Sequence, residues 1–308
     1  MSVPTTSIAK FNNVLPKELR NPWIRTGILL MVTILIYHSV MFELYLSWVN
    51  NHYYSHGFLI PVISLYLVFR NRDRLRKTET NTHLYGIIPA ILGIVIFLFA
   101  EFSCRSLFLS STSMIIFLMG GVLFFFGRDH LKALLFPILF LLFMIPIPDF
   151  VFNSVTGPLQ LTAASIGEFV LKCLGAPVHR EGIYLYLGPV TIKVARGCSA
   201  MHSLIALSAL SVIVAYVILD SFSKRIVIVA SSIPIAILAN GFRLVLIISL
   251  IVWMGEEVLH SLFHPLSGEV LFLCDLSVLA LEALILRRFG KGGGGIKSSF
   301  LTKTLGKP

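Results

Sequence analysis

The chain has 308 residues, of which 56% are hydrophobic and only 13% are charged, and its mean hydropathy is +0.87. About a quarter of the residues in a soluble globular domain are charged, so this composition excludes an ordinary soluble protein and predicts a polytopic membrane protein. The formal net charge of +10 is compatible with nucleic-acid binding, but no polar segment is long enough to form a nucleic-acid-binding domain, and we expect none.

Continuous apolar runs determine the predicted fold class. Runs of roughly 17 to 25 residues match the thickness of a bilayer core, where helices or closed barrels satisfy the backbone. The runs do not alternate apolar and polar residues, so we expect an all-α protein. We place about eight transmembrane helices, near residues 24–46, 57–69, 84–101, 107–126, 131–147, 198–219, 226–252 and 268–286. The second run is short for a span, but the charge pattern requires a crossing there.

Basic residues gather in alternate loops, which predicts the orientation of the chain. Four lie in residues 1–25, five in 70–77, two in 127–132, two in 220–225 and six in 287–308. We therefore expect both termini in the cytoplasm of a cell whose plasma membrane the chain crosses. The predicted organisation is a basic N-terminus (1–23), a single membrane domain (24–286) and a basic glycine-rich tail (287–308). The first span reads as an uncleaved anchor.

The longest loop on the outer side, about residues 148–197, has structure of its own. The prolines of IPIP (145–148) end the fifth span. An amphipathic helix on or in the outer face of the membrane is predicted over 157–177, because Leu159, Ala163, Ile166, Val170 and Leu174 recur at helical spacing. Two short runs around a Gly-Pro pair, in GIYLYLGPVTIKV, then predict a β-hairpin that leads to Cys198.

Cys198 is the candidate nucleophile. It lies in ARGCSAMHS (195–203), among small residues at the start of a predicted span. The amides of a helix N-terminus and a nearby cation both favour a thiolate. Cys104 and Cys173 are both expected on the outer side, so a disulfide between them stays open, and Cys274 reads as a small buried hydrophobic residue.

Arg243 is the second candidate. A guanidinium in the apolar run around NGFR (240–243) costs about 2.5 to 3.5 kcal/mol near the bilayer centre, so it needs a partner or a wet cavity. Asn240 lies three residues earlier on the same helical face. The alternative is a structural arginine that pairs with backbone carbonyl groups between helices.

His264 precedes the last predicted span on the outer side and is a candidate acid/base, although a histidine at a membrane border is common without any role. His202, one turn after Cys198, is a second candidate base. His260 and His264 have the spacing of two metal ligands, but no HExxH motif occurs. We expect neither a metal nor a cofactor.

These blocks together resemble the exosortase/archaeosortase family of membrane-embedded cysteine transpeptidases, from about residue 48 to 275. YSHGFLIPVISLYLV (54–68) is similar to the SHG segment of that family, and IPIP, GPLQ (157–160) and LGAPVHREG (174–182) are similar to its middle region. The signature blocks follow in order, with Cys198 in GCSA, Arg243 in NGFR and His264 in HPLSG. Three residues depart from the family pattern: Ala200 replaces a glycine, His202 an arginine, and Arg196 an acidic residue.

The resemblance implies a function. Cys198, Arg243 and His264 would be catalytic, with Asn240, Ser199, His202 and Gly268 near the substrate. The partners would be exported proteins with a tripartite C-terminal sorting signal, cleaved on the outer face and passed to an acceptor such as a lipid or glycan carrier. A non-catalytic or transport component of polysaccharide export, and a metal-dependent intramembrane protease, are the alternatives.

Overall fold

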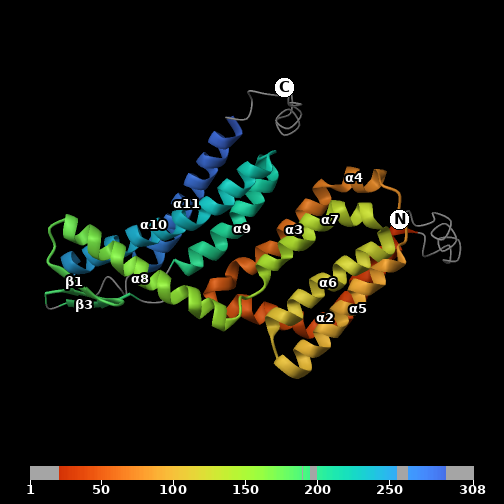
Figure 1. Ribbon diagram of the computed structural model, residues 1–308, viewed down its shortest axis with the longest axis horizontal. Helices are drawn as coiled ribbons and strands as arrows, with labels where there is room; N and C mark the ends of the chain where they lie inside the picture. Colours follow the sequence, from red (N-terminus) through yellow and green to blue (C-terminus); the bar gives the residue numbers. More distant parts are fainter. Residues whose placement is uncertain (1–20, 189, 195–199, 255–262, 289–308) are drawn as a thin grey trace. The chain divides into compact units, whose positions relative to one another are not determined.

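The computed structural model describes residues 21–188, 190–194, 200–254 and 263–288, and most of them are helical (Figure 1). The chain is an all-α polytopic membrane protein with one small sheet. Within these described ranges, five helices are long and apolar enough to cross a membrane, and a sixth span results if the bent pair Arg128–Met144 and Asp149–Cys173 is counted as one. The remaining expected crossings fall on α3 (Leu59–Arg70), which has only 12 residues, and on α11 (Phe263–Arg288). The count of eight therefore stays a prediction.

The chain forms two compact units that divide between Phe152 and Asn153. The helices of the first unit are α2 (Pro22–Asn50), η2 (His52–Phe58), α3, α4 (Arg72–Lys77), η3 (Leu84–Gly86), α5 (Ile87–Phe99), η4 (Ala100–Cys104), α6 (Leu107–Phe126), α7 (Arg128–Phe140) and η5 (Leu141–Met144). Within it, α6 packs against α2, α5 and α7. The core includes Tyr37, whose ring contacts Phe97 and Phe117.

Side chains of η2 and of the end of α2 form hydrogen bonds with the backbone of the proline-rich stretch that follows η5. Proline has no N–H group and interrupts regular hydrogen bonding, so the backbone near IPIP (145–148) needs other partners. Nε1 of Trp48 donates to the carbonyl oxygen of Met144 at 2.9 Å. The backbone N–H of Ile147 donates to the hydroxyl oxygen of Tyr54 at 3.1 Å. These two hydrogen bonds hold the IPIP segment to the end of α2 and to the start of the SHG segment, and we call this contact the junction between the SHG and IPIP segments.

The short helix α3 is held to α7 by two side-chain hydrogen bonds. Pro137 lies inside α7 and cannot donate to the carbonyl of Ala133 as an ordinary helical residue would. The side-chain amide of Asn71 donates to that carbonyl instead, at 3.1 Å. Ser64 Oγ, which is buried, donates to the carbonyl of Pro137 at 2.8 Å.

The second unit contains α8 (Asp149–Cys173) from its fifth residue onward, a three-stranded antiparallel sheet, and α9 (Met201–Ile218), α10 (Phe222–Met254) and α11. The sheet has the order β1 (Val178–Glu181), β2 (Tyr184–Leu187) and β3 (Val190–Lys193), with Val178 opposite Leu187 and Leu187 opposite Val190. The predicted hairpin is confirmed as β2 and β3, and β1 is an additional strand.

Helix α8 confirms the predicted helix on this loop but has different bounds. It begins at Asp149, directly after Pro148, and continues through Pro158. It ends at Cys173, because Gly175 adopts a left-handed φ of 83°. Leu174, the last residue of the predicted apolar stripe, lies one residue beyond the helix, and its side chain is 68% exposed. The buried stripe consists of Thr156, Ala163, Ala164, Gly167 and Leu171.

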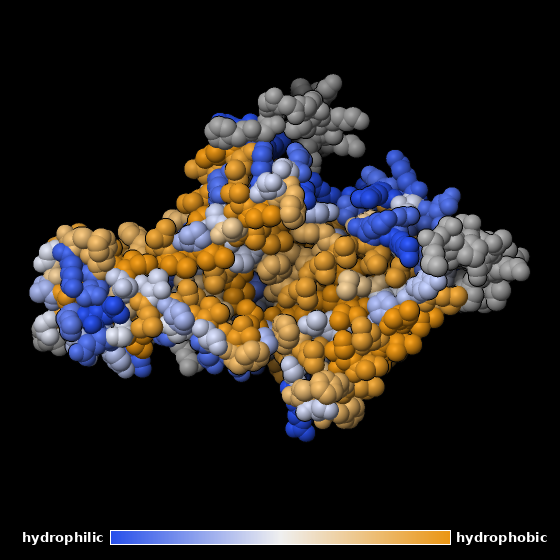
Figure 2. All heavy atoms as spheres, viewed as in Figure 1, coloured by the Kyte–Doolittle hydropathy of each residue, from blue (hydrophilic) through white to orange (hydrophobic). Residues whose placement is uncertain are grey.

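Helices α9, α10 and α11 pack against one another. Two polar contacts hold α11 to α10: Lys224 Nζ donates to the carbonyl of Leu286 at 2.7 Å, and Ser231 Oγ donates to Glu282 Oε2 at 2.6 Å. Cys274 is exposed on α11, so its expected burial was wrong. The neighbouring positions Asp275 and Leu279 face the core instead. Figure 2 shows apolar side chains over the flanks of the helices and hydrophilic residues gathered near α4 and around the sheet.

Candidate functional site

The structure describes some of the predicted site residues and not others. Cys198 and Ser199 lie outside the described residues. His264 and Gly268 are described as backbone positions in the first two turns of α11. Arg243, Asn240 and His202 are described in full. The geometry therefore concerns the segments on either side of Cys198, the turn of α10 that carries Arg243, and the start of α11.

Val194 anchors the chain on the N-terminal side of Cys198. It directly follows β3, its N–H group donates to the carbonyl of Ile183 at 2.9 Å, and its side chain is 1% exposed. Its carbonyl oxygen accepts a hydrogen bond of 3.0 Å from the side-chain amide of Gln160 on α8. The sequence pattern did not single out either residue for the site, although Gln160 ends the GPLQ block.

Ala200 anchors the chain on the other side. It is buried and is the N-cap of α9, and its carbonyl accepts a hydrogen bond of 2.8 Å from the N–H group of Leu204. Its φ of 64° lies in the left-handed region, which costs an L-residue about 1–2 kcal/mol. Met201 follows and is also buried. Two buried residues, Val194 and Ala200, thus flank the five-residue stretch to which Cys198 belongs.

Arg243 lies on α10 at a close approach to α8. Gly241 makes this approach possible, because a Cβ atom there would lie 2.7 Å from Cγ2 of Ile166. Asn240 is 6% exposed and Arg243 is partly buried. The residue after Arg243, Leu244, belongs to the same hydrophobic core as Val194; the other members of this core are Ala163, Ala164, Leu171, Val178, Leu185, Val245 and Ile248.

One core therefore contains the position directly after Arg243 and the position four residues before Cys198. It joins α8, the sheet and the C-terminal half of α10. The sequence shows the Cys198 and Arg243 blocks only as separate segments. The structure shows that residues next to these two blocks, Val194 and Leu244, pack in the same core.

The start of α11 carries His264. The contacts of Lys224 with Leu286 and of Ser231 with Glu282 show that α10 and α11 run antiparallel. At 1.5 Å per residue, Arg243 lies about 18 Å along α10 from Ser231, and His264 lies about 27 Å along α11 from Glu282, in the same direction. The two positions are thus separated by about 9 Å along the helix axes. His202, in the first turn of α9, is partly buried.

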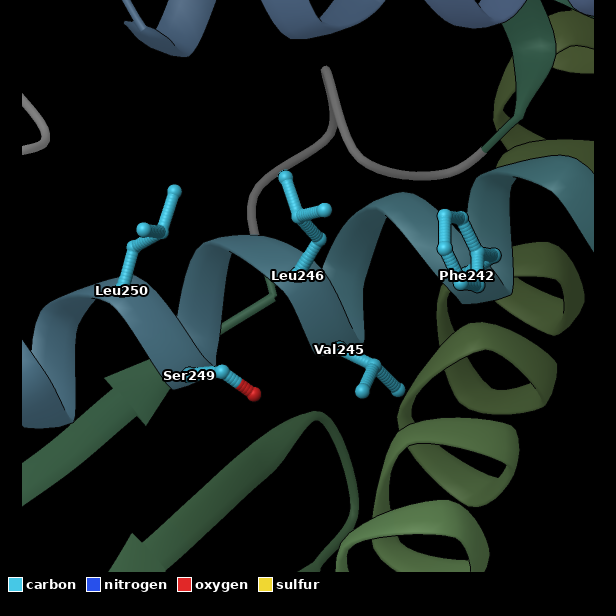
Figure 3. A pocket seen from close by; sticks show the side chains of 5 residues that line it. All are labelled: Phe242, Val245, Leu246, Ser249 and Leu250. Carbon is cyan, nitrogen blue, oxygen red and sulfur yellow. The ribbon is translucent and has the colours of Figure 1, made fainter.

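An apolar hollow of about 410 Å³ lies along the part of α10 that follows Asn240 and Gly241 (Figure 3). Phe242, Val245, Leu246, Ser249 and Leu250 line it, all from α10. Figure 3 shows Leu246 and Leu250 pointing to one side of the helix and Ser249 to the other. The hollow runs for two turns from the level of Arg243 toward the end of α10.

Among the described residues, no three His, Cys, Asp or Glu side chains lie close enough together to hold a metal ion. His260, which the metal-site alternative requires, lies outside the described residues. Cys104 and Cys173 are free and exposed, and so is Cys274.

A family model described as transmembrane exosortase matches residues 48–281. No curated protein and no solved structure matches the chain. The matched range covers the SHG segment, the whole of α8 and the sheet, and the three blocks that hold Cys198, Arg243 and His264.

Proposed function

Because the chain belongs to the transmembrane exosortase family, we propose that it is a membrane-embedded cysteine transpeptidase. Its substrates are exported proteins that carry a C-terminal sorting signal composed of a short motif, a hydrophobic span and a basic cluster. Cleavage takes place on the outer face of the cytoplasmic membrane, and the released protein passes to an acceptor, a lipid- or glycan-linked nucleophile.

One observation carries the proposal: a single hydrophobic core holds Val194, four residues before Cys198, and Leu244, next to Arg243. A nucleophile and an oxyanion-stabilising cation must come from rigid elements that keep a fixed separation. On the other side of the cysteine segment, the chain continues with the buried Ala200 and the first turn of α9. This packing supports a site built from α9, α10 and the sheet.

The proposed reaction has two steps. The Cys198 thiolate attacks the carbonyl carbon of the scissile peptide, and the guanidinium of Arg243 stabilises the oxyanion. The C–N bond breaks, the leaving amine takes a proton from His264, and a thioester remains. The acceptor then loses its proton to the neutral His264 and attacks the thioester, which regenerates the thiolate. Asn240, Ser199, His202 and Gly268 lie around the substrate.

Processing of a membrane-anchored substrate tests the nucleophile. Cys198→Ala should abolish processing, whereas Cys104→Ala, Cys173→Ala and Cys274→Ala should retain it as matched controls. Insertion and thermal unfolding in detergent confirm that each variant folds. Unimpaired processing by Cys198→Ala would refute the proposal.

Single-turnover rates test the proton carrier. His264→Ala should lose about 10² to 10⁴ in rate through loss of proton transfer, and His202→Ala should lose less. A larger loss at His202 would assign the proton transfer to that residue. Inhibition by a chelator that added zinc reverses would instead support the metalloprotease alternative.

Reporter fusions test the orientation. Fusions after Arg225 and at the C-terminus should both report the cytoplasm, and a charged thiol reagent should reach Cys198 only from outside. An outside signal at either fusion would contradict the proposed topology.

A further inference from the structure

Gln160 forms a hydrogen bond between α8 and the end of the sheet. It lies on α8 two residues after Pro158, and its side chain is partly buried. Nε2 of Gln160 donates to the carbonyl oxygen of Val194 at 3.0 Å, across 34 residues of sequence. Figure 1 shows α8 lying along the sheet, and the core shared by these elements holds Val194 in place.

The carbonyl of Val194 needs a donor because the strand ladder has ended. The last register pair between β2 and β3 joins Tyr184 and Lys193. The N–H group of Val194 still bonds to the carbonyl of Ile183, but the Val194 carbonyl lies beyond the ladder. The residue is buried, and a buried carbonyl without a donor costs about 1–3 kcal/mol. Gln160 supplies the donor.

The direction of this carbonyl matters for the chain that follows. A peptide group is planar, so the hydrogen bond from Gln160 fixes the plane of the peptide group to which the Val194 carbonyl belongs. Cys198 is the fourth residue after Val194, and the buried N-cap of α9, Ala200, is the second residue after Cys198. A change at the Val194 carbonyl therefore acts on the chain four residues before Cys198.

We propose that Gln160 is a positioning residue for the Cys198 nucleophile, acting through the carbonyl of Val194. The inference rests on the proposed function, because it requires Cys198 to be the reacting group. It gives a role to the GPLQ block, which the reaction itself leaves without one. Gln160 does not contact the substrate in this role, so its loss affects the rate of acylation and leaves substrate binding intact.

The test compares Gln160→Met, which has no donor, with Gln160→Glu, which has one only when its carboxyl group is protonated. Both variants should lower kcat by roughly 10- to 100-fold near neutral pH, with KM unchanged, since small misplacements of reacting groups cost rates of this order. As the pH falls, the kcat of Gln160→Glu relative to wild type should rise, because the protonated carboxyl donates to the Val194 carbonyl. The ratio for Gln160→Met should stay constant.

Thr162→Val is the matched control. Thr162 is exposed on the same helix and donates only to the carbonyl of Pro158 within that helix, so kcat should equal that of wild type. The rate at which Cys198 reacts with a neutral alkylating reagent, in a protein without the other three cysteines, gives a readout that needs no substrate. Relative to wild type at the same pH, this alkylation rate should fall in Gln160→Met. In Gln160→Glu the ratio to wild type should recover as the pH falls.

The outcomes separate the two proposals. If Cys198→Ala processes substrate at the wild-type rate, the proposed function fails. If Cys198→Ala is inactive while Gln160→Met has the wild-type kcat and alkylation rate, only the positioning role is overturned. It is also overturned if Gln160→Glu is impaired equally at every pH, since a general packing defect would not respond to protonation of that carboxyl.

Discussion

Replacing Gly57 with alanine should destabilise the junction between the SHG and IPIP segments. Gly57 is buried in η2 beneath the indole of Trp48. A Cβ atom at this position would lie less than 3.0 Å from three atoms of that ring, which real Cβ atoms essentially never do. The indole cannot move freely, because its Nε1 donates to the carbonyl of Met144 and its ring packs edge-on against Phe58.

The expected loss of stability depends on which contacts change when the methyl group is added. Overpacking a filled site costs about 1–3 kcal/mol. If the indole of Trp48 moves to relieve the contact, its hydrogen bond to Met144 is lost, which costs about 0.5–1.5 kcal/mol more. We therefore expect Gly57→Ala to lower the free energy of unfolding by roughly 1.5–4.5 kcal/mol.

Unfolding in detergent, followed by tryptophan fluorescence and by helix content, measures this change. Gly27→Ala is the matched control: a Cβ atom on Gly27 meets nothing within 4 Å, and alanine favours the helix α2, so stability should stay the same or rise. Gly57→Ala should also cost less when Trp48 is leucine, because the clashing ring is gone. A change below about 0.5 kcal/mol, or an equal loss in both backgrounds, would refute the reasoning.

Three further predictions concern backbone strain, helix packing and pH. Ala200→Gly should raise the midpoint of thermal unfolding, because glycine adopts the φ of 64° without strain. After the larger entropy of glycine in the unfolded chain is subtracted, the free energy of unfolding should rise by about 0.5–1 kcal/mol, and a lower midpoint would contradict this. Gly241→Ala should destabilise by about 1–2 kcal/mol in chemical unfolding, and less when Ile166 is valine, which removes part of the contact. Burial lowers the pKa of His56 below its usual 6.5, so the folded state loses stability as the pH falls through 6.5 toward the folded-state pKa. The unfolding midpoint of wild type should consequently drop more on acidification than that of His56→Gln, and equal drops would exclude this role.

The helices could be predicted because their signal is local. Continuous apolar runs placed α5, α6, α9 and α10 within a few residues, since each run fills a bilayer by itself. The bounds of α8 were less predictable. The apolar spacing predicted a start at residue 157, but the helix begins eight residues earlier, at Asp149, and continues through Pro158. Leu174 fits the apolar spacing yet lies beyond the residue where the helix ends.

The site could be predicted only as separate blocks. Cys198, Arg243 and His264 differ from their neighbours in residue type and local context, and the sequence alone shows such differences. The bond of Gln160 to Val194 and the contact of Gly241 with Ile166 depend on how α8 packs against the sheet and α10. No spacing in the sequence reports such contacts. Strand β1 was missed for the same reason, because its charged residues match no alternating pattern and only its pairing with β2 identifies it.

The attachment of α3 to α7 bears on how the protein enters the membrane during synthesis. The 12 residues of α3 extend only about 18 Å, well short of the roughly 30 Å of a hydrocarbon core. The carbonyl groups that receive Asn71 and Ser64 belong to Ala133 and Pro137, which the ribosome adds more than 60 residues later. Helix α3 thus emerges before its anchoring partner exists. The two hydrogen bonds that hold α3 can form only after α7 has been synthesised, so α3 reaches its final packing later than its place in the order of translation.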